Sequence, residues 1–471
     1  MPTSQPHAIV VVGAGMAGLA AAEALLDRSP RPAVTIIEPS GRVGGVVGTV
    51  RDGDWLVERS ADNVLVARPE AVDMVRRLGL EEELVSIPAA RRRALVWHAG
   101  RGVPAPRGFR LLAPGRLDGV LTTPLLSMPG RLRLLAEPLV RRGRGGDESL
   151  ESFAVRRLGR EAFERLVQPL AAGIWTADPS RLGMEAACPE FLQMEREHGS
   201  LWAGERARLR RTGGAAATGA RYGQFVALAS GMETLPRRLA ERLAAAGATF
   251  LTDAATGLER TAAGWRVQLA SGAVRQADAV VVAVPAPVAS RLVAAVDHGL
   301  AVELAAIDYA GSAVVCLGYR RDQIGHPLDA AGMVVPRTAG RRALAVSFSS
   351  EKFPGRAPAG CVLVRLFVGG ALDPAVLDMP DAAIVELARK EAGVLLAAHG
   401  EPLLQRLERW QGTMPQYHVG HLDRVARIEA AVARHPGLAL AGAAYRGVGI
   451  PQVIASGQAA AAAVSPSRQP A

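Results

Sequence analysis

The chain has 471 residues, 49% of them apolar, which is enough material for two or three domains with cores of their own. Its formal net charge of +10 comes almost wholly from arginine, since only Lys352 and Lys390 are lysines. Aromatic residues make up only 4% and no nucleic-acid-binding motif is visible, so we do not expect nucleic acid to be a partner.

Three cysteines, Cys188, Cys316 and Cys361, lie far apart without a C-x-x-C pattern, which predicts reduced thiols in a cytoplasmic protein. The apolar start of the chain lacks the basic residues of a secretory signal, so we do not expect export. No uninterrupted run of about 18 apolar residues occurs, so any contact with a membrane is expected to be peripheral.

The first predicted element is an apolar strand over residues 8–12, followed by Gly13, Gly15 and Gly18 and by a helix. A second apolar run ends in Glu38. This arrangement predicts a βαβ unit that binds an adenine dinucleotide. Gly13 permits the tight turn, Gly15 lets the backbone approach a pyrophosphate, and Gly18 lets helix and strand pack closely. The helix N-terminus then faces the phosphates, and Glu38 can accept hydrogen bonds from ribose hydroxyls.

Arg42, Gly44 and Gly45 follow the acid at once, where an NAD enzyme would normally resume a helix. The paired glycines predict a second loop of close backbone approach, and Arg42 offers a cation to a diphosphate. This E-x3-R-x-G-G pattern resembles the flavin-containing amine oxidase superfamily. We therefore expect FAD rather than NAD as the cofactor.

From about residue 110 to 203 the pattern becomes helical. Leu132, Leu135 and Leu139 recur on one predicted face, and arginines surround them. Two interpretations of this basic amphipathic helix stay open: a surface helix packed on its own domain, or a contact with a membrane surface or a partner. The Arg-Gly-Ala-rich stretch 204–219 is predicted to be an exposed linker.

After the linker, a helix over residues 231–244 and strands over 249–251 and 279–285 return the chain to the nucleotide-binding sheet. That domain is therefore predicted to be discontinuous. Further strand-like runs predict a mostly antiparallel sheet over the cofactor, at residues 313–319, 343–348 and 362–368.

Near the other end of the chain, a strand over residues 438–441 leads into a glycine-rich bend from Gly442 to Gly449 and then into a helix with Pro451 in its first turn. Proline at this position loses no helical hydrogen bond and fixes φ. The helix N-terminus is predicted to face the flavin pyrimidine edge, where its dipole would stabilise the negative charge that develops on reduction.

Several long segments, taken in order, resemble the family of oxygen-dependent protoporphyrinogen oxidases and coproporphyrinogen III oxidases. Beside the two glycine motifs, they cover residues 160–161, 173–179, 195–201, 350–358 and 409–422. The resemblance implies an α/β (α+β) protein with a discontinuous Rossmann-like FAD-binding domain, an antiparallel-sheet substrate domain and a helical membrane-associated insertion. The implied ranges are 1–88, 220–298 and 406–465 for the FAD domain, 89–109 and 299–405 for the substrate domain, 110–203 for the helical domain and 204–219 for the linker.

The same resemblance implies roles for individual residues. The FAD phosphates and ribose would contact Gly13, Gly15, Gly18, Glu38, Arg42, Gly44 and Gly45. Ala255 would bind the adenine end through its backbone, and Gly449 and Ile450 would lie at the isoalloxazine. Gly442 of the same C-terminal bend is also expected to bind the cofactor. Arg93 stands where the family pairs an arginine with a substrate propionate. Gly173 stands where a backbone group near flavin N5 orients the tetrapyrrole, and no metal site is expected.

The implied reaction is the FAD-dependent oxidation of a porphyrinogen, protoporphyrinogen IX or coproporphyrinogen III, with O2 as acceptor and H2O2 as product, in heme biosynthesis. Catalysis would depend on positioning and on the cofactor, because no His/Asp/Ser or metal constellation is visible. Beside the substrate and O2, candidate partners are a membrane surface, a second copy of the chain and a downstream chelatase. The protein is expected in the cytoplasm or peripherally on the cytoplasmic membrane.

Three positions depart from the family's pattern. Ser60 replaces a glycine near the flavin, Ala443 the usual asparagine, and Gln452 a frequent aspartate. A non-catalytic FAD-fold escort therefore stays an alternative, beside an amine oxidase or a carotenoid desaturase of the same superfamily. Amine oxidases commonly need a lysine beside the flavin, and no motif places Lys352 or Lys390 there. Three histidines are expected to be structural: His198, His418 and His421.

Overall fold

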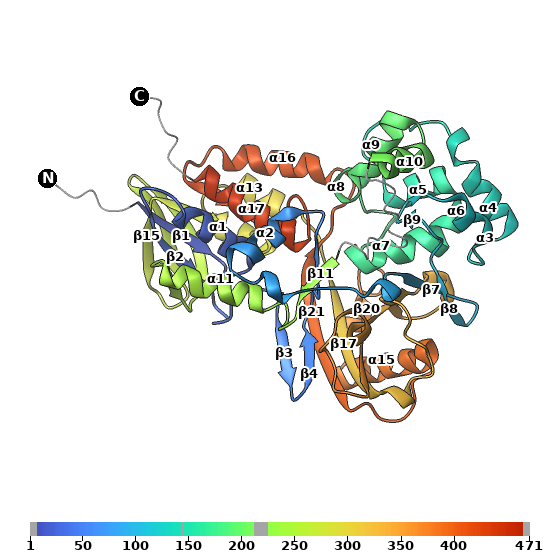
Figure 1. Ribbon diagram of the computed structural model, residues 1–471. Coiled ribbons are helices and arrows are strands. Elements are labelled where there is room, and N and C mark those ends of the chain that lie inside the picture. The colour runs from blue at the N-terminus through green and yellow to red at the C-terminus, as the bar shows by residue number, and fades with distance from the viewer. Residues whose placement is uncertain (1–6, 144, 212–224, 465–471) are drawn as a thin grey trace.

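The computed structural model describes residues 7–143, 145–211 and 225–464. Figure 1 shows three groups of elements: α/β layers that carry both ends of the chain, a long sheet below them, and a cluster of helices at the opposite side. The mixed helix and sheet architecture confirms the predicted fold class in its general form.

The first sheet has five strands, all parallel, drawn from three distant parts of the sequence. In spatial order they are β12 (Thr249–Leu251), β2 (Ala33–Ile37), β1 (Ala8–Val12), β16 (Ala279–Val282) and β22 (Leu438–Leu440). β1 and β16 are almost entirely buried because helices or strands cover both faces, which is why their sequences are continuous apolar runs. The nucleotide-binding sheet is thus discontinuous in sequence, as predicted.

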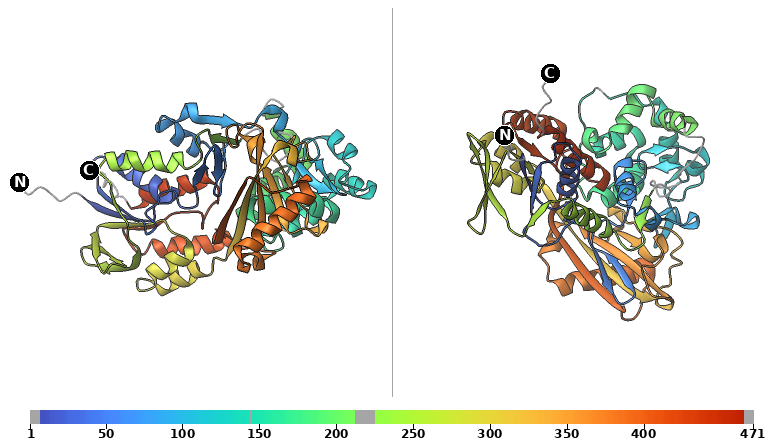
Figure 2. Two further views of the ribbon diagram at one scale, coloured as in Figure 1. Left: turned by 90° about the horizontal axis from the view of Figure 1, so that it is seen from below. Right: turned by 60° about the vertical axis from the view of Figure 1, so that its left-hand side comes forward.

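Two layers cover this sheet. One face is covered by α1 (Met16–Leu26), α11 (Thr234–Ala245) and α17 (Ile450–Ala463). The other face is covered by α12 (Ala286–Val293), α13 (His298–Ala305), α16 (His421–Val432) and the small sheet β13 (Ala255–Thr261), β14 (Gly264–Leu269) and β15 (Val274–Ala277). The left view of Figure 2 shows light-green α11 and yellow α13 on opposite sides of the domain.

The second sheet has seven strands and is antiparallel except for the β7–β18 pair. In spatial order they are β21 (Leu404–Pro415), β17 (Tyr309–Arg320), β20 (Cys361–Gly369), β19 (Ala343–Phe348), β18 (Gly332–Val334), β7 (Ala94–His98) and β8 (Arg101–Pro104). Helix α15 (Asp381–Leu396) packs on one face of it. The mostly antiparallel sheet that the sequence predicts is present.

The predicted start of the last FAD-domain segment, residue 406, is too early. β21 pairs with β17 along its length, from Leu404 opposite Gly318 to Pro415 opposite Tyr309. Residues 406–415 therefore belong to the seven-stranded sheet. The error arises because the partner of a strand is decided by tertiary contacts, and local sequence pattern does not reveal it.

The helical domain lies between β8 and the second part of the nucleotide-binding domain in sequence. Its α-helices are α3 (Leu117–Thr122), α4 (Met128–Leu135), α5 (Leu150–Leu158), α6 (Arg160–Ala162), α7 (Gln168–Trp175), α8 (Met184–Ala187), α9 (Pro189–His198) and α10 (Leu201–Arg211). In the described part of the chain, no helix has the length and apolarity to cross a membrane.

Part of the predicted linker 204–219 is helical. Residues 204–211 continue α10, where the nearly buried carboxylate of Glu205 pairs with Arg110 at 3.1 Å and with Arg208 at 2.6 Å. These ion pairs fasten a segment whose composition resembles a linker. Residues 212–219 lie outside the described residues.

The three leucines predicted to share one face of the basic helix do not have the same environment. α4 ends at Leu135, and in the turn that follows Glu137 is fully buried and pairs with the equally buried Arg157. Leu134 is the buried leucine of this helix, whereas Leu132 and Leu139 are 61% and 85% exposed. Leu135 is partly buried against the domain's core, whereas Leu132 and Leu139 are left at the surface, where a membrane or a partner could contact them.

Candidate active site

The first glycine loop leaves β1 and enters α1. The Gly13 amide donates to the Ile37 carbonyl oxygen at 2.8 Å, which joins the loop to the end of β2. A Cβ on Gly13 would lie 2.7 Å from the Ala283 carbonyl oxygen, and a Cβ on Gly18 would lie 1.9 Å from the Gly13 carbonyl oxygen. Both glycines are therefore required by the packing of the protein itself.

Gly15 has a different environment. Apart from its immediate neighbours in the chain, no described residue has an atom within 4 Å of the position that a Cβ on Gly15 would take. Beside it runs the second glycine loop: the Gly44 amide donates to the Ala14 carbonyl oxygen at 2.8 Å, and Gly45 and Gly44 both have positive φ. The two loops form a cradle that is open above Gly15, at the N-terminus of α1.

Glu38 holds the cradle from the end of β2. Its carboxylate accepts hydrogen bonds from the Ala14 amide at 3.0 Å and from the Ser40 hydroxyl at 2.7 Å. A carboxylate can accept about four hydrogen bonds, so capacity is left for the hydroxyls of a ribose. The predicted ribose contact of Glu38 stays a prediction.

The Arg42 guanidinium is bound within its own loop. It donates to the carbonyl oxygens of Val43 at 3.3 Å, Val47 at 3.0 Å and Gly45. The Arg42 guanidinium thus stabilises the conformation of the glycine loop. The sequence predicts that this guanidinium faces a diphosphate. Its phosphate contact stays a prediction, and through these bonds the positive charge is held close to Gly45.

The C-terminal bend approaches the same edge of the sheet. Gly442 has φ +130° with open space around its missing side chain, and Gly449 is the N-cap of α17, whose first turn contains Ile450. A Cβ on Gly457 would lie 2.1 Å from the Ala17 carbonyl oxygen, so α17 and α1 cross in direct contact. Because both helices follow parallel strands, both N-termini lie at the carboxyl edge of the sheet, where nucleotides bind in such folds.

Ala255 follows β12, the outermost strand of the parallel sheet on the side of β2. It begins β13, opposite Leu269 of β14, shortly after β12 pairs with β2. β2 carries Glu38 at its end, so the segment that leads to Ala255 leaves the same side of the cradle. Its backbone contact with adenine stays a prediction.

Gly173 faces the seven-stranded sheet. The nearest described atom to a Cβ on Gly173 would be a Val334 methyl carbon at 3.9 Å. Val334 belongs to an apolar cluster that also packs against Ala345 of β19 and Val448 of the C-terminal bend. Figure 1 shows α7 between the helices and strands β7 and β20. The structure therefore brings the helix of Gly173 close to the sheet, and Val448, the residue before Gly449, packs on the same large apolar cluster.

Arg93 precedes β7 and is bound to its neighbour Asp329. Its Nε donates to the Asp329 carbonyl oxygen at 2.9 Å, and its Nη2 pairs with the Asp329 carboxylate. The Arg93 side chain is still 43% exposed. Arg91 pairs with Glu351 at 2.8 Å. The predicted propionate contact of Arg93 would thus compete with a carboxylate of the chain itself.

The comparisons with known proteins agree with this geometry. The sequence model of flavin containing amine oxidoreductases matches residues 16–465. The chain belongs to this family. Among its relatives, the coproporphyrinogen III oxidase of Bacillus subtilis is 30% identical over 96% of both chains, and that of Propionibacterium freudenreichii is 32% identical over 95% of this chain and 88% of its own length.

Solved structures give the same family fold. A putative protoporphyrinogen oxidase from Exiguobacterium superposes with a TM-score of 0.85 at 28% identity, covering 97% of this chain and 98% of its own. A reduced UDP-galactopyranose mutase superposes with a TM-score of 0.72 at 16% identity, covering 97% and 93%. The latter likeness concerns the fold alone.

FAD, the cofactor of this flavoprotein family, fits the residues present. Gly15 and Gly442 leave open space where a close-lying ligand needs it, and the N-termini of α1 and α17 meet at that edge. Two helix N-termini favour an anionic group such as a diphosphate or a reduced flavin. Among the described residues, no group of three or more His, Cys, Asp and Glu side chains could hold a metal ion.

Sequence reasoning missed a buried charge cluster in the loop after β4 (Trp55–Glu58). Asp62 pairs with Lys352 at 2.7 Å and with Arg365 at 3.2 Å, and both cations are nearly inaccessible. Burial opposes ionisation of Asp62, but the two cations outweigh it and lower its pKa to about 2. Arg365 also donates to the Ser60 carbonyl oxygen, so the cluster fixes the loop in which serine replaces the family's glycine.

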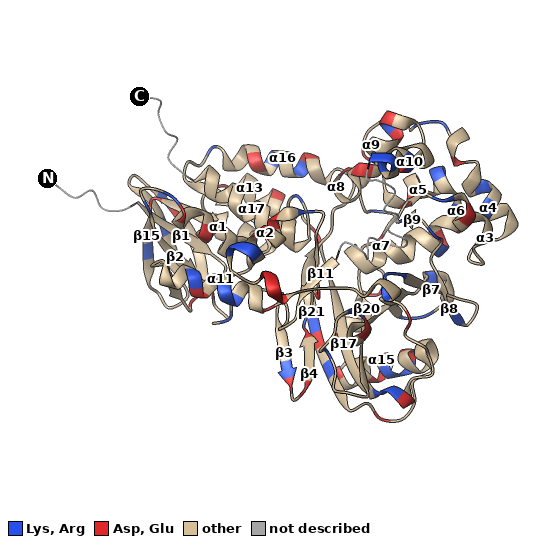
Figure 3. Ribbon diagram, in the orientation of Figure 1, with Lys and Arg blue, Asp and Glu red and all other residues tan. Residues whose placement is uncertain are grey.

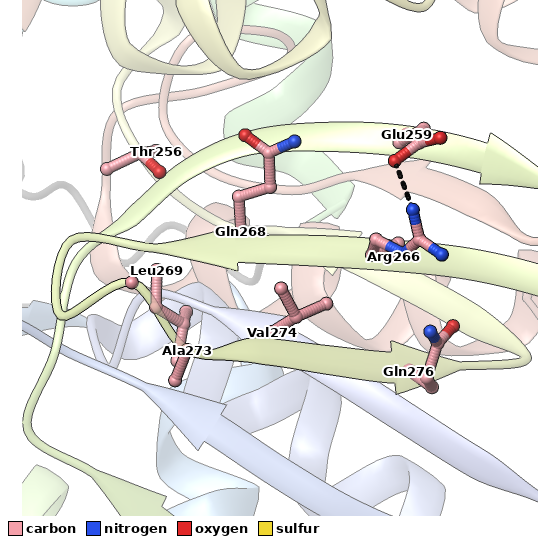
Figure 4. Close-up of a pocket in the computed structure, with 9 residues that line it drawn as sticks. Thr256, Glu259, Arg266, Gln268, Leu269, Ala273, Val274 and Gln276 are labelled. Atoms are coloured by element: carbon pink, nitrogen blue, oxygen red, sulfur yellow. Dashed lines mark hydrogen bonds and ion pairs between the residues drawn. The ribbon is translucent and has the colours of Figure 1, made fainter.

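A separate hollow of about 540 Å³ lies on the outer face of β13, β14 and β15. Its walls include Thr256, Gln268 and Gln276 and the Glu259–Arg266 ion pair (Figure 4). None of the predicted site residues lines it. We therefore assign the chemistry to the edge of the parallel sheet and not to this surface hollow.

Proposed function

We propose that the chain oxidises a porphyrinogen, coproporphyrinogen III or protoporphyrinogen IX, to the corresponding porphyrin. The observation that carries the proposal is the approach of Gly173 to the sheet residue Val334, within an apolar cluster on which Val448 of the C-terminal bend also packs. A porphyrinogen is an apolar macrocycle with carboxylates at its rim and needs an apolar wall of this kind. Relatives named coproporphyrinogen III oxidase and protoporphyrinogen oxidase match almost the whole chain.

Bound FAD would supply the two-electron oxidant, taking a hydride equivalent from the substrate and returning the electrons to O2 as H2O2. The chain's own task is positioning. The cradle around Gly15 would hold the diphosphate, and the N-terminus of α17 would favour the negative charge that develops on the flavin when it is reduced. The macrocycle's nitrogen lone pairs stabilise the cation that hydride loss creates, so the site needs no strong base. The cycle is repeated three times per porphyrin.

One experiment tests this function directly. Each porphyrinogen is supplied to the FAD-loaded protein with and without O2, and flavin absorbance, porphyrin fluorescence and peroxide are recorded. We expect flavin bleaching without O2, and porphyrin with peroxide in its presence. Flavin that is reduced by neither porphyrinogen, but by an amine or by phytoene, would replace this proposal with one of the two alternative oxidoreductases.

We further propose that Arg93 binds a substrate propionate. Arg93→Ala is then expected to weaken porphyrinogen binding by about 1 to 3 kcal/mol, the scale of a charge-assisted hydrogen bond. Asp329→Asn should have the opposite effect, because it releases the guanidinium from its present partner. Apparent substrate affinity in steady-state turnover measures both. Unchanged affinity in Arg93→Ala would refute this role, and Arg91→Ala serves as the control because Arg91 pairs with Glu351.

A peripheral membrane contact is proposed for the helical domain. α3, α4 and the turn after α4 expose a group of large apolar side chains: Leu117, Leu121, Met128, Leu132 and Leu139. Basic positions stand beside them on α4, and Figure 3 shows them in blue. Exposed apolar side chains flanked by arginine favour the surface of an anionic bilayer.

Replacing Leu132 and Leu139 together by aspartate is expected to reduce binding to anionic lipid vesicles by about tenfold or more, since two apolar contacts are lost and two negative charges are added. Cosedimentation with vesicles of anionic and of neutral lipid measures it. Val302→Asp, at a residue 54% exposed on α13, is the matched control and should bind as the unmodified protein does. Absence of vesicle binding by the unmodified protein would contradict the proposal.

A further inference from the structure

The segment from Gln416 to His421 connects β21 to α16 and is fastened to the helical domain. The Gly183 amide donates to the Tyr417 carbonyl oxygen at 2.7 Å, and the Val419 amide donates to the Arg181 carbonyl oxygen at 2.9 Å. Arg181 and Gly183 lie in the loop that follows α7, the helix of Gly173. The backbone of this segment is therefore bonded to the loop that connects α7 to α8.

The Tyr417 side chain points the other way, into the flavin-facing bend. Its hydroxyl donates to the Ala443 carbonyl oxygen at 2.5 Å and accepts from the Gly447 amide at 2.8 Å. Tyr417 is only 2% exposed, so no water competes for these bonds. One hydroxyl thus bridges two points of the bend that leads to Gly449.

His421 binds the bend at Tyr445, which lies between Ala443 and Gly447 in the sequence. Its ring stacks on Tyr417 with 4.1 Å between the centroids, and its Nε2 lies 3.0 Å from the Tyr445 carbonyl oxygen. A carbonyl only accepts, so Nε2 carries the hydrogen in this bond. Burial lowers the pKa of His421 to about 4, and the ring is neutral at physiological pH.

We propose that Tyr417, supported by His421, is a positioning residue that sets the C-terminal bend relative to α7. Its backbone is bonded to the loop after α7, and its hydroxyl to both sides of the bend. The distance between the substrate-facing Gly173 and the flavin-facing N-terminus of α17 is then controlled through one side chain. The kinetic part of this inference rests on the proposed function, and its effect on the flavin does not.

Tyr417→Phe tests the proposal because it removes the hydroxyl and keeps the ring that stacks on His421. We expect FAD to bind about tenfold more weakly and the flavin reduction potential to shift. A tenfold change in the ratio of affinities for oxidised and reduced FAD corresponds to about 30 mV for a two-electron couple. With porphyrinogen, kcat should fall about tenfold while KM changes by less than about twofold, because alignment and not binding is lost.

Tyr319→Phe is the matched control. Tyr319 is also 2% exposed, but it lies on β17 in the apolar cluster under α15. The potentials of both variants are measured against a reference dye, and unfolding is followed in the same samples. Tyr417→Phe could be less stable than the unmodified protein and still have the same flavin reduction potential and kcat as Tyr319→Phe. In that case Tyr417 has only a structural role, and the proposal is overturned.

Two further results are decisive. If Tyr417→Phe shifts the potential while the unmodified protein oxidises neither porphyrinogen, the positioning role stands and the proposed function fails. If Tyr417→Phe gives no folded holoenzyme, His421→Phe is measured in the same way, since it keeps an aromatic stack and removes the bond from Nε2 to the bend at Tyr445. An unshifted potential in that variant overturns the proposal.

Discussion

Replacing Gly15 by alanine is expected to leave a folded protein that binds FAD about a hundredfold more weakly, a loss of roughly 3 kcal/mol. The backbone at Gly15, with φ −69° and ψ 175°, suits any residue, and beyond its chain neighbours no described residue has an atom within 4 Å of the new methyl group. The methyl would instead occupy the space that the pyrophosphate needs. FAD titration followed by flavin fluorescence, together with thermal unfolding of the apoprotein, measures both effects.

Gly18→Ala is the matched control for this prediction. There the new Cβ would lie 1.9 Å from the Gly13 carbonyl oxygen, so the backbone of the loop must move. We expect an unfolding free energy lower by about 3 kcal/mol even without FAD, on the scale of overpacked cores. If Gly15→Ala binds FAD as tightly as the unmodified chain does, the diphosphate does not lie over Gly15 and the proposed cradle is wrong.

Asp62→Asn is expected to destabilise the protein by about 3 to 5 kcal/mol, because it leaves Lys352 and Arg365 buried without their carboxylate. Lys352 and Arg365 are 6% and 1% exposed, so solvent cannot replace the lost partner. Because the cluster also holds the Ser60 carbonyl oxygen, FAD binding should weaken in parallel. Equilibrium denaturation in urea, with and without FAD, measures both quantities.

Asp308→Asn provides the comparison for this ion pair. Asp308 pairs with Arg181 at 3.1 Å, but the two side chains are 55% and 59% exposed. Exposed pairs of this kind contribute about 1 kcal/mol or less. A similar loss of stability in the two variants would show that the Asp62 cluster is no more important than a surface pair, contrary to our expectation.

Local sequence patterns were sufficient for much of the fold. The glycine loop after β1 follows from steric demands within a few residues, since Gly18 must lie against Gly13. The apolar runs at β1 and β16 likewise predict buried parallel strands by themselves. FAD could therefore be predicted as the cofactor from the sequence, and the family comparison confirms it.

Other features depend on contacts between distant residues, and no local pattern predicts them. The Lys352–Asp62 bond joins positions 290 residues apart, and the Arg93–Asp329 bond joins positions 236 apart. The resemblance assigned Arg93 to a substrate propionate, and no sequence pattern assigned Lys352 a role. Only the fold shows that the first already has a carboxylate and that the second is buried beside one.

The sequence alone determined the nucleotide-binding layers and the two glycine-rich turns, because turns and buried strands are set by short-range sterics and by the periodicity of apolar residues. The tertiary structure alone decided that β21 joins the second sheet, that residues 204–211 are helical, and that Tyr417 reaches the bend before α17. Each of these depends on a hydrogen bond or ion pair whose partner is distant in sequence, and its strength comes from burial that exists only in the folded chain.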